Sequence, residues 1–224
     1  MKVYAHRGAS GRKPEMTMAA YLAAIEDKAD GFECDVRLTK DLQIICHHDP
    51  TTKRLSGKNL RISGTDYDEI RATGEVLKLA ELLDLAILNR KNLLIETKHP
   101  VKSGGVIEGK VLELLAENKQ EIAKAEISIF LMSFSALAVK RIGKNAEKIK
   151  ITKYLISTLL SPTENLAIDL HLAKRYRGLI NYLLGRRKMV FVWTVNEYID
   201  LELCRRAKVS AVISDFPARA HADE

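Results

Sequence analysis

Two carboxylates separated by one residue stand in an otherwise apolar stretch of the sequence, at Glu33 and Asp35. Side chains alternate between the two faces of a β-strand, so these carboxylates share one face and their apolar neighbours share the other. Two buried charges need a compensating partner, because leaving them unpaired costs several kcal/mol. A hard cation such as Mg²⁺ or Ca²⁺ prefers carboxylate oxygens and would supply it. The alternative is a pair of salt bridges, for instance to Lys98 and Arg37.

Glu96 and Lys98 repeat this spacing at the end of an apolar run, residues 92–98. If the two strands are neighbours, Glu96 lies beside Glu33 and Asp35 and completes a site of three carboxylates. Lys98 is then free to meet a phosphate oxygen. A Schiff-base lysine is the rival interpretation, but that chemistry needs a depressed pKa, and three nearby carboxylates act in the opposite direction.

Histidines follow two further apolar segments, in Ala5-His6-Arg7-Gly8 and in His47-His48-Asp49-Pro50. A single histidine at a strand end is more often structural than catalytic. Two histidines on either side of a scissile P–O bond, however, can divide the work of general acid and general base. The alternation of side chains does not decide which of His47 and His48 points inward.

The elements that must position these groups alternate between short β-rich runs and helical stretches, which is typical of βα units and a parallel sheet. Eight strands are predicted, at residues 2–6, 31–37, 92–98, 127–132, 149–156, 166–170, 189–194 and 210–214. Helices are predicted at residues 17–28, 79–89, 105–118, 135–142, 173–184 and 197–207.

A ninth strand, residues 42–47, follows the second too closely for an intervening helix and is predicted to form a hairpin arm. Residues 51–78 are polar and are predicted to form an excursion at the rim with at most one short helix. Eight βα units close into a (β/α)8 barrel, which leaves no exposed sheet edge. A doubly wound open sheet is the alternative, but it lacks support from a glycine-rich turn after the first strand. With no linker in the sequence, residues 1–224 are expected to form a single domain.

The bulk composition narrows the class of protein. The net charge is +7, with 36 basic and 29 acidic residues, which fits a lysine-rich surface or attraction of an anionic substrate or membrane. Nucleic-acid binding is not expected, because no basic stripe is interleaved with aromatic residues. No apolar run is long enough to span a bilayer, and the first residues lack the features of a signal peptide. Buried thiols are expected at Cys34 and Cys46, and the protein is expected in the cytoplasm.

An ordered set of motifs resembles the glycerophosphodiester phosphodiesterase family and covers essentially the whole chain. The set comprises His6-Arg7-Gly8, Pro14-Glu15, Glu33-x-Asp35-Val36, Thr39-Lys40-Asp41, His48-Asp49-Pro50 with Arg54, Glu96-x-Lys98, Trp193-Thr194-Val195-Asn196 and Ile213-Ser214-Asp215-x-Pro217. The resemblance implies a TIM barrel that hydrolyses glycerophosphodiesters, small anionic substrates, to glycerol 3-phosphate and an alcohol. It also implies a bound Mg²⁺ or Ca²⁺.

The resemblance also implies roles for individual residues. Glu33, Asp35 and Glu96 would be metal ligands, and His6 and His48 the acid–base pair, because the family's catalytic histidine directly precedes Asp-Pro. The substrate-binding residues would be Arg7 and Lys98, which hold the phosphate, and Trp193, which lines the mouth. The alternative for Trp193 is a core aromatic residue. Asn196 and Asp215 are assigned structural roles first, with Asn196 as a helix N-cap.

Two positions depart from the family pattern. Met16 stands where an asparagine is usual, so a hydrogen-bonding side chain next to the site is lost. Leu42 stands where a glycine is usual, so the hairpin is expected to bend differently.

The short excursion predicts an open mouth suited to small, soluble diesters. A lysophospholipase D-like enzyme acting on another phosphodiester lipid is the first alternative function. A non-catalytic barrel that binds a phosphate ligand is the second, although such a protein would be expected to have lost a ligand or a histidine.

Overall fold

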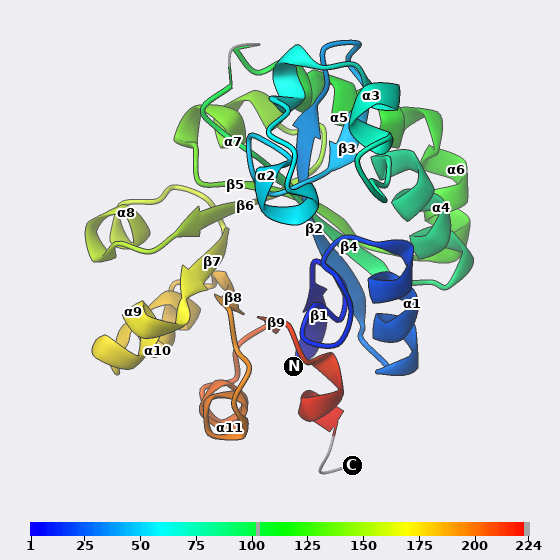
Figure 1. The fold of residues 1–224 in the computed structure, drawn as a ribbon. Coiled ribbons are helices and arrows are strands. Elements are labelled where there is room, and N and C mark those ends of the chain that lie inside the picture. The colour runs from blue at the N-terminus through cyan, green and yellow to red at the C-terminus, as the bar shows by residue number, and fades with distance from the viewer. Residues whose placement is uncertain (102–103, 222–224) are drawn as a thin grey trace.

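Eight parallel strands close into a barrel in the computed structural model, which describes residues 1–101 and 104–221 (Figure 1). Strand β1 pairs with β2 on one side and with β9 on the other, so the sheet has no open end among these eight strands. The barrel strands are β1 (Lys2–His6), β2 (Gly31–Leu38), β4 (Asn92–Thr97), β5 (Ile129–Ser133), β6 (Glu147–Thr152), β7 (Asn165–Asp169), β8 (Met189–Trp193) and β9 (Ala211–Ser214). The predicted (β/α)8 barrel is confirmed, and the open-sheet alternative is wrong.

Helices follow the barrel strands and cover the outside of the barrel. They are α1 (Met18–Glu26), α4 (Leu79–Leu88), α5 (Val106–Glu117), α6 (Lys119–Ala125), α7 (Ala136–Ile142), α8 (Leu155–Leu159), α9 (Leu170–Arg175), α10 (Leu179–Gly185), α11 (Tyr198–Arg206) and the 3₁₀ helix η2 (Pro217–His221). Side-chain caps begin several of them: Thr17, Ser135 and Asp169 each accept a hydrogen bond from the backbone of the first turn.

The predicted helix 173–184 is in fact two helices. Asp169 caps a helix that already begins at Leu170, and this helix ends before Tyr176, whose backbone is not helical. A new helix then starts after Gly178. Helices α6 and α8 were not predicted, and the predicted strand 149–156 ends at Thr152, because α8 contains its last two residues.

Alternation along β2 sorts its side chains between two different environments. Phe32, Cys34 and Val36 are fully buried among the helices outside the barrel. Glu33 and Asp35 therefore point into the barrel interior. The lower interior is filled by aromatic and aliphatic side chains, including Tyr4, Phe130 and Phe191, whose rings pack at centroid distances of 5.7–6.1 Å. This packed floor leaves the polar residues at the carboxyl ends of the strands, where barrel active sites lie.

Strand β3 (Ile44–Cys46) pairs antiparallel with β2, which confirms the predicted hairpin arm. The excursion after it differs from the prediction: it contains three short helices, α2 (Lys53–Ser56), η1 (Ile62–Gly64) and α3 (Tyr67–Arg71). Its apolar residues are few but converge with β3 in a small core of their own, formed by Ile45, Ile62, Tyr67, Ile70 and Val76.

Two further predictions concern membrane-spanning helices and the cysteines. None of the described helices is long and apolar enough to cross a membrane. All three cysteines are free and buried, as expected for Cys34 and Cys46.

Candidate active site

Three carboxylates meet inside the barrel mouth at the ends of β2 and β4. The parallel register places Asp35 beside Glu96, and Glu33 lies two residues earlier on the same face as Asp35. One oxygen from each of the three side chains lies within 4.8 Å of the others, and all three residues are buried. The sequence prediction of a convergent carboxylate cluster therefore agrees with the geometry.

Lys98 and Arg7 provide the positive charge next to these carboxylates. Lys98 Nζ lies 2.8 Å from Asp35 Oδ1 and 2.7 Å from Glu96 Oε1. Arg7 Nε lies 2.9 Å from Asp35 Oδ2, although its N–H is not aligned for a hydrogen bond. The sequence predicts that Lys98 is free to meet a phosphate oxygen. In the structure two carboxylates, Asp35 and Glu96, hold it instead.

Burial and mutual repulsion perturb the three carboxylates unequally. Burial, followed by the charge of Asp35, raises the pKa of Glu33 to about 7 and that of Glu96 to about 8. Burial would also raise the pKa of Asp35, but Lys98 and Arg7 outweigh it and hold that pKa below its usual value. In the protein alone, two cations therefore do not fully compensate three carboxylates.

This cluster fits a divalent cation. It offers only oxygen donors, which Mg²⁺ and Ca²⁺ prefer. Asp35 Oδ2 is buried without a hydrogen bond, and the raised pKa values of Glu33 and Glu96 indicate a local lack of positive charge. A bound cation would supply that charge.

Two histidines lie at the same mouth in matching arrangements. At the end of β1, His6 Nδ1 lies 2.6 Å from Asp215 Oδ1. In the loop after β3, His48 Nδ1 lies 2.8 Å from Asp49 Oδ1. Each aspartate orients its ring through Nδ1 and leaves Nε2 for another partner; His6 Nε2 is 4.0 Å from Glu33 Oε2. Both histidines line one cavity with Glu33, Glu96 and Lys98.

The environments shift the pKa values of these histidines in opposite directions. Burial disfavours protonation of His6, but the hydrogen bond to Asp215 and the charge of Glu33 outweigh it and raise its pKa. Burial, together with the charges of Lys98 and Arg7, lowers the pKa of His48, although the charge of Asp35 and the hydrogen bond to Asp49 act in the opposite direction. The neighbouring His47 is almost completely buried, its Nδ1 bonds to the Asp49 carbonyl oxygen, and it does not line the cavity.

Asp215 contributes more to the site than the structural role predicted from sequence. Besides His6, it contacts Ser10 Oγ at 2.9 Å and accepts a hydrogen bond from Asn196 Nδ2 at 2.7 Å. Asn196 is not the predicted N-cap, because α11 is preceded by Glu197 at that position. Its side chain also accepts a hydrogen bond from the Asp215 backbone, so it fixes the orientation of Asp215.

An ion-pair network that the sequence did not reveal connects the two histidine arms. Glu15 lies 3.2 Å from Arg7 Nη1 and accepts hydrogen bonds of 2.7 and 2.9 Å from Arg54. Arg54 also donates to Asp49, the residue that orients His48. Glu15, Asp49 and Arg54 were recognised only as members of motifs, because their contacts join segments up to 39 residues apart.

The opposite wall of the cavity is apolar. It is formed by Met132, Phe134, Ile151, Ala167, Trp193 and Ile213. The Trp193 indole N–H donates to the Ala167 carbonyl oxygen at 3.2 Å, and its ring packs edge-on against Phe134. Trp193 is partly buried and lines the mouth. It therefore has features of both predicted alternatives, a residue that lines the mouth and a core aromatic residue.

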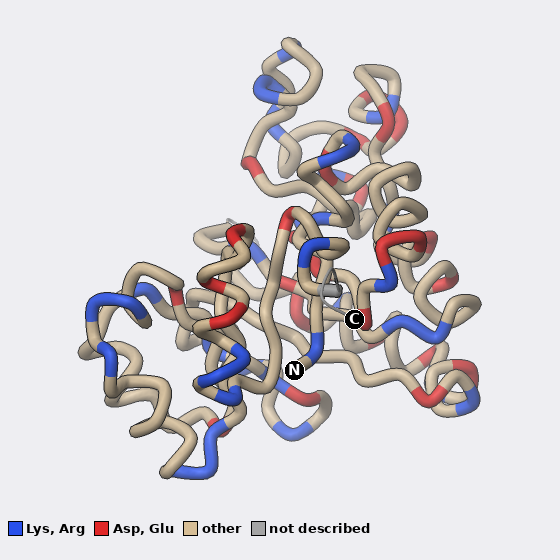
Figure 2. The backbone as a smooth tube through the Cα atoms, turned by 90° about the horizontal axis from the view of Figure 1, so that it is seen from below, with Lys and Arg blue, Asp and Glu red and all other residues tan. Residues whose placement is uncertain are grey.

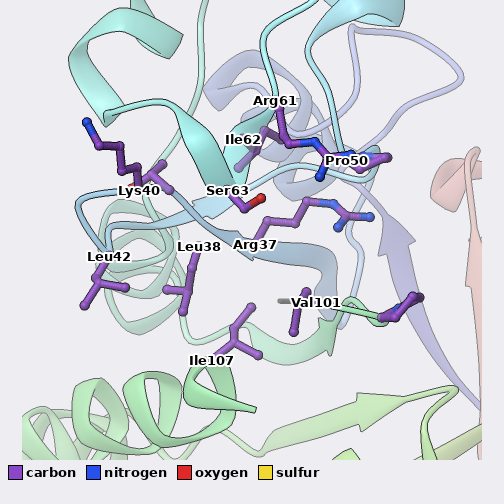
Figure 3. Close-up of a pocket in the computed structure, with 12 residues that line it drawn as sticks. Arg37, Leu38, Lys40, Leu42, Pro50, Arg61, Ile62, Ser63, Val101 and Ile107 are labelled. Atoms are coloured by element: carbon purple, nitrogen blue, oxygen red, sulfur yellow. The ribbon is translucent and has the colours of Figure 1, made fainter. Parts of the chain in front are cut away.

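A second pocket of about 270 Å³ lies outside this cavity, between the β2–β3 hairpin, η1 and the segment after β4 (Figure 3). Arg37 lines it and donates two hydrogen bonds, of 2.9 and 2.8 Å, to the His48 carbonyl oxygen. Arg37 forms no ion pair with any residue in the described part of the chain. The alternative to a metal was a pair of salt bridges to Arg37 and Lys98. Among the described residues the salt bridge to Arg37 is absent, whereas Lys98 does pair with Asp35.

Both departures from the family pattern adopt a left-handed backbone. Met16 has φ 54° and Leu42 has φ 62°. Leu42 thus adopts a conformation that glycine adopts without strain. Met16 is buried, and its backbone N–H donates to the Arg7 carbonyl oxygen at 2.8 Å.

Comparisons with known proteins agree with this geometry. Among curated proteins, the chain is 34% identical to a probable glycerophosphodiester phosphodiesterase 1 of Mycobacterium tuberculosis, over 98% of this chain and 91% of that protein. Among solved structures, a glycerophosphodiester phosphodiesterase of Thermotoga maritima has a TM-score of 0.81 at 23% identity, over 96% of this chain and 95% of that one.

A phosphodiesterase of Oleispira antarctica, solved in complex with the product sn-glycerol-3-phosphate, has a TM-score of 0.77 at 18% identity, over 99% of this chain and 96% of that one. At this identity the two structures support the fold. The sequence profile of the glycerophosphoryl diester phosphodiesterase family matches residues 6–219. The chain therefore belongs to the glycerophosphoryl diester phosphodiesterase family, whose members are phosphoric diester hydrolases.

Proposed function

We propose that the protein hydrolyses glycerophosphodiesters to glycerol 3-phosphate and an alcohol, with a divalent cation and with His6 and His48 as the acid–base pair. The observation that carries this proposal is the pairing of each histidine with an aspartate through Nδ1 at a single cavity that also holds three buried carboxylates. The product bound to the Oleispira antarctica relative is consistent with the proposed substrate class.

Glu33, Asp35 and Glu96 would hold the cation, either Mg²⁺ or Ca²⁺. When bound, such an ion supplies positive charge for a phosphate oxygen that becomes more negative in the transition state. Lys98 and Arg7, which already lie beside Asp35, would bind the remaining phosphate oxygens. Glu15 holds the Arg7 guanidinium from its other side and keeps it in place for this role.

The two histidines would move the protons. As the nucleophile forms its bond to phosphorus, one histidine accepts the proton from the attacking hydroxyl. As the bond to the leaving oxygen breaks, the other histidine donates a proton to that oxygen and the alcohol departs neutral. The nucleophile is either water or the neighbouring glycerol hydroxyl, and the second route first gives a cyclic phosphate that water opens. Asp215 and Asp49 would act as positioning residues that hold the tautomer in which Nε2 faces the substrate.

Release of glycerol 3-phosphate tests this proposal. Metal-stripped protein is incubated with glycerophosphocholine or glycerophosphoethanolamine, with and without added Mg²⁺ or Ca²⁺. We expect release only after a metal is added, and a transient cyclic phosphate if the glycerol hydroxyl attacks first. Glu96→Gln should need far more metal for half-maximal release, whereas Glu121→Gln, on the exposed surface of α6, should behave like the unchanged protein.

Two outcomes would replace the proposal. If folded protein releases nothing from either diester but cleaves a lysophospholipid, the substrate is a lipid diester. If it cleaves neither with any metal yet binds glycerol 3-phosphate, the barrel is a binding module. Release that is unchanged after metal removal would contradict the role of the three carboxylates.

A further inference from the structure

Helix α8 packs Leu155 partly against the barrel core but leaves its other apolar side chains exposed, whereas a normal surface helix turns its apolar residues inward. Ile156, near its start, and Leu160, just after its end, are 72% and 77% exposed, and Tyr154 just before the helix is 65% exposed. Thr158 is completely buried and donates to the Tyr154 carbonyl oxygen at 2.9 Å. Thr158 Oγ1 also lies 3.2 Å from the hydroxyl of Thr152 at the end of β6, so a hydroxyl contact attaches the helix to the barrel, while Ile156, Leu159 and Leu160 remain exposed.

This helix lies on the same side of the barrel as the active site. It begins shortly after the carboxyl end of β6, and in Figure 1 it projects to the left, away from the barrel. Phe134 and Leu137, which follow the carboxyl end of the neighbouring strand β5, are 41% and 64% exposed. Phe134 also lines the catalytic cavity. The exposed apolar residues therefore continue from the cavity wall on to the rim.

A groove of about 590 Å³ between α7 and α8 combines apolar walls with lysines. Val139, Leu160 and Pro162 contribute apolar surface, and Lys140, Lys148 and Lys150 contribute charge, with no acidic residue among those that line it. Lys148 and Lys150 are bonded to backbone carbonyl oxygens. Within residues 1–101 and 104–221, these three lysines and Lys153 form no ion pair. Such a surface matches an anionic amphiphile, with acyl chains for the apolar part and head groups for the lysines.

The net charge of the chain is concentrated in its second part, which contains both α7 and α8. Residues 1–126 contain 20 basic and 20 acidic residues, whereas residues 127–224 contain 16 basic and 9 acidic ones, so the whole net charge of +7 belongs to the second part. Figure 2 shows Lys and Arg predominating on the left, the side occupied in Figure 1 by α8 to α11. The exposed apolar helix thus lies in the positively charged half.

We propose that helix α8 and the α7–α8 groove, which lie on the side of the barrel next to the rim at Phe134, dock the protein on an anionic phospholipid bilayer. The apolar residues of α8 enter the interface between head groups and acyl chains, and the lysines contact the anionic head groups. A second copy of the chain is a poorer partner for this face, because pairing it with itself brings two positively charged halves together.

Co-sedimentation of the full chain with vesicles tests the proposal. One set of vesicles contains equal parts of phosphatidylcholine and phosphatidylglycerol, and the other contains phosphatidylcholine alone. We expect the protein to pellet with the anionic vesicles at low salt, and to do so at least roughly tenfold more weakly with the neutral ones. High salt should weaken binding without abolishing it, because the apolar part of the contact is not screened.

Matched variants separate this face from the rest of the surface. Ile156→Ser with Leu160→Ser should lower vesicle affinity by at least about tenfold. Leu88→Ser removes a side chain that is 80% exposed at the end of α4, and should change nothing. Lys140→Gln with Lys153→Gln should weaken binding to anionic vesicles, whereas Lys2→Gln with Lys119→Gln, which removes the same charge elsewhere, should have a smaller effect.

Thermal melting of each variant establishes that it is folded before its binding is compared. The proposal is overturned if the unchanged protein stays in the supernatant with anionic vesicles. It is also overturned if the α8 pair and the Leu88 control lose affinity equally. A dimer in light scattering that the Ile156/Leu160 pair dissociates would assign the face to self-association instead.

Discussion

The two arcs of the catalytic cavity are lined by different chemistry. Strands β1 to β4 and their loops contribute His6, Arg7, Glu33, His48, Glu96 and Lys98, whereas β5 to β9 contribute Met132, Phe134, Ile151, Ala167, Trp193 and Ile213. The polar arc is held by ion pairs and hydrogen bonds that reach as far as Asp215 and Arg54. The apolar arc makes few polar contacts and adjoins the exposed apolar rim.

This contrast separates two tasks. Charged groups accelerate a reaction only if they are held in place before it begins, so the polar arc needs a network of fixed partners. An apolar wall needs only shape, and it can accept different leaving alcohols without changing the chemistry. The polar arc would therefore determine how fast the diester is cleaved, and the apolar arc which diester is bound.

The largest expected effect lies in the polar arc. His6→Ala should lower kcat by about 10²–10⁴-fold, because the proton transfer at that position is lost. The exposed His171 on α9 provides a control, since His171→Ala should leave kcat unchanged. The measurement is steady-state release of glycerol 3-phosphate, with circular dichroism to verify folding. A near-normal rate for the His6 variant would remove His6 from the catalytic pair.

The pH dependence of metal binding is the next largest expected effect. In the metal-free protein, the pKa is about 7 for Glu33 and about 8 for Glu96, so metal binding must displace protons below those values. Because the pKa values of both carboxyl groups are raised on folding, the two groups stabilise the metal-free fold at low pH. This contribution to the free energy of unfolding is lost as the pH rises through these two pKa values. Mg²⁺ affinity should therefore increase by roughly tenfold or more between about pH 6 and pH 8.

Calorimetric titrations in buffers of different ionisation enthalpy would measure both the affinity and the protons released. An affinity that does not change over this pH range would mean that the carboxylates are already ionised without the metal.

A smaller effect is expected from Asp215, which touches His6 and not the reacting atoms. Asp215→Asn should lower kcat by roughly tenfold to a hundredfold, less than removal of the imidazole. Loss of the carboxylate charge should also lower the pKa of His6, because Asp215 raises it through a hydrogen bond and through its charge. The limb of the kcat/KM profile that reports His6 should move to lower pH. A reduced rate with an unmoved profile would indicate that Asp215 supports only the local fold.

The smallest effect is expected in the apolar arc. Trp193→Leu should raise KM by about threefold to tenfold and leave kcat within about twofold, because it changes a contact to the leaving alcohol rather than a proton transfer. The ratio of KM values for glycerophosphocholine and glycerophosphoethanolamine should change as well. A large loss of kcat with constant KM would break the division between the two arcs.

Much of the polar arc could be predicted from local patterns. Alternation along a strand places Glu33 with Asp35 and Glu96 with Lys98, and the pairing of neighbouring parallel strands brings the two pairs together. The contacts that orient the histidines could not be predicted from such local patterns. His6 and Asp215 are 209 residues apart, and only closure of the barrel between β1 and β9 makes them neighbours. Apolar periodicity in turn contains no information on whether α8 is covered.

The sequence by itself determined the order of the strands and of the longer helices, the barrel, and the residue types at the strand ends, because the periodicity within each element is local. Only the tertiary structure decided which aspartates orient the histidine pair, and that Lys98 is shared between Asp35 and Glu96. It also decided that the apolar residues of α8 are exposed. These features depend on side chains from distant segments that meet when the barrel closes, and no local pattern in the sequence encodes such a meeting.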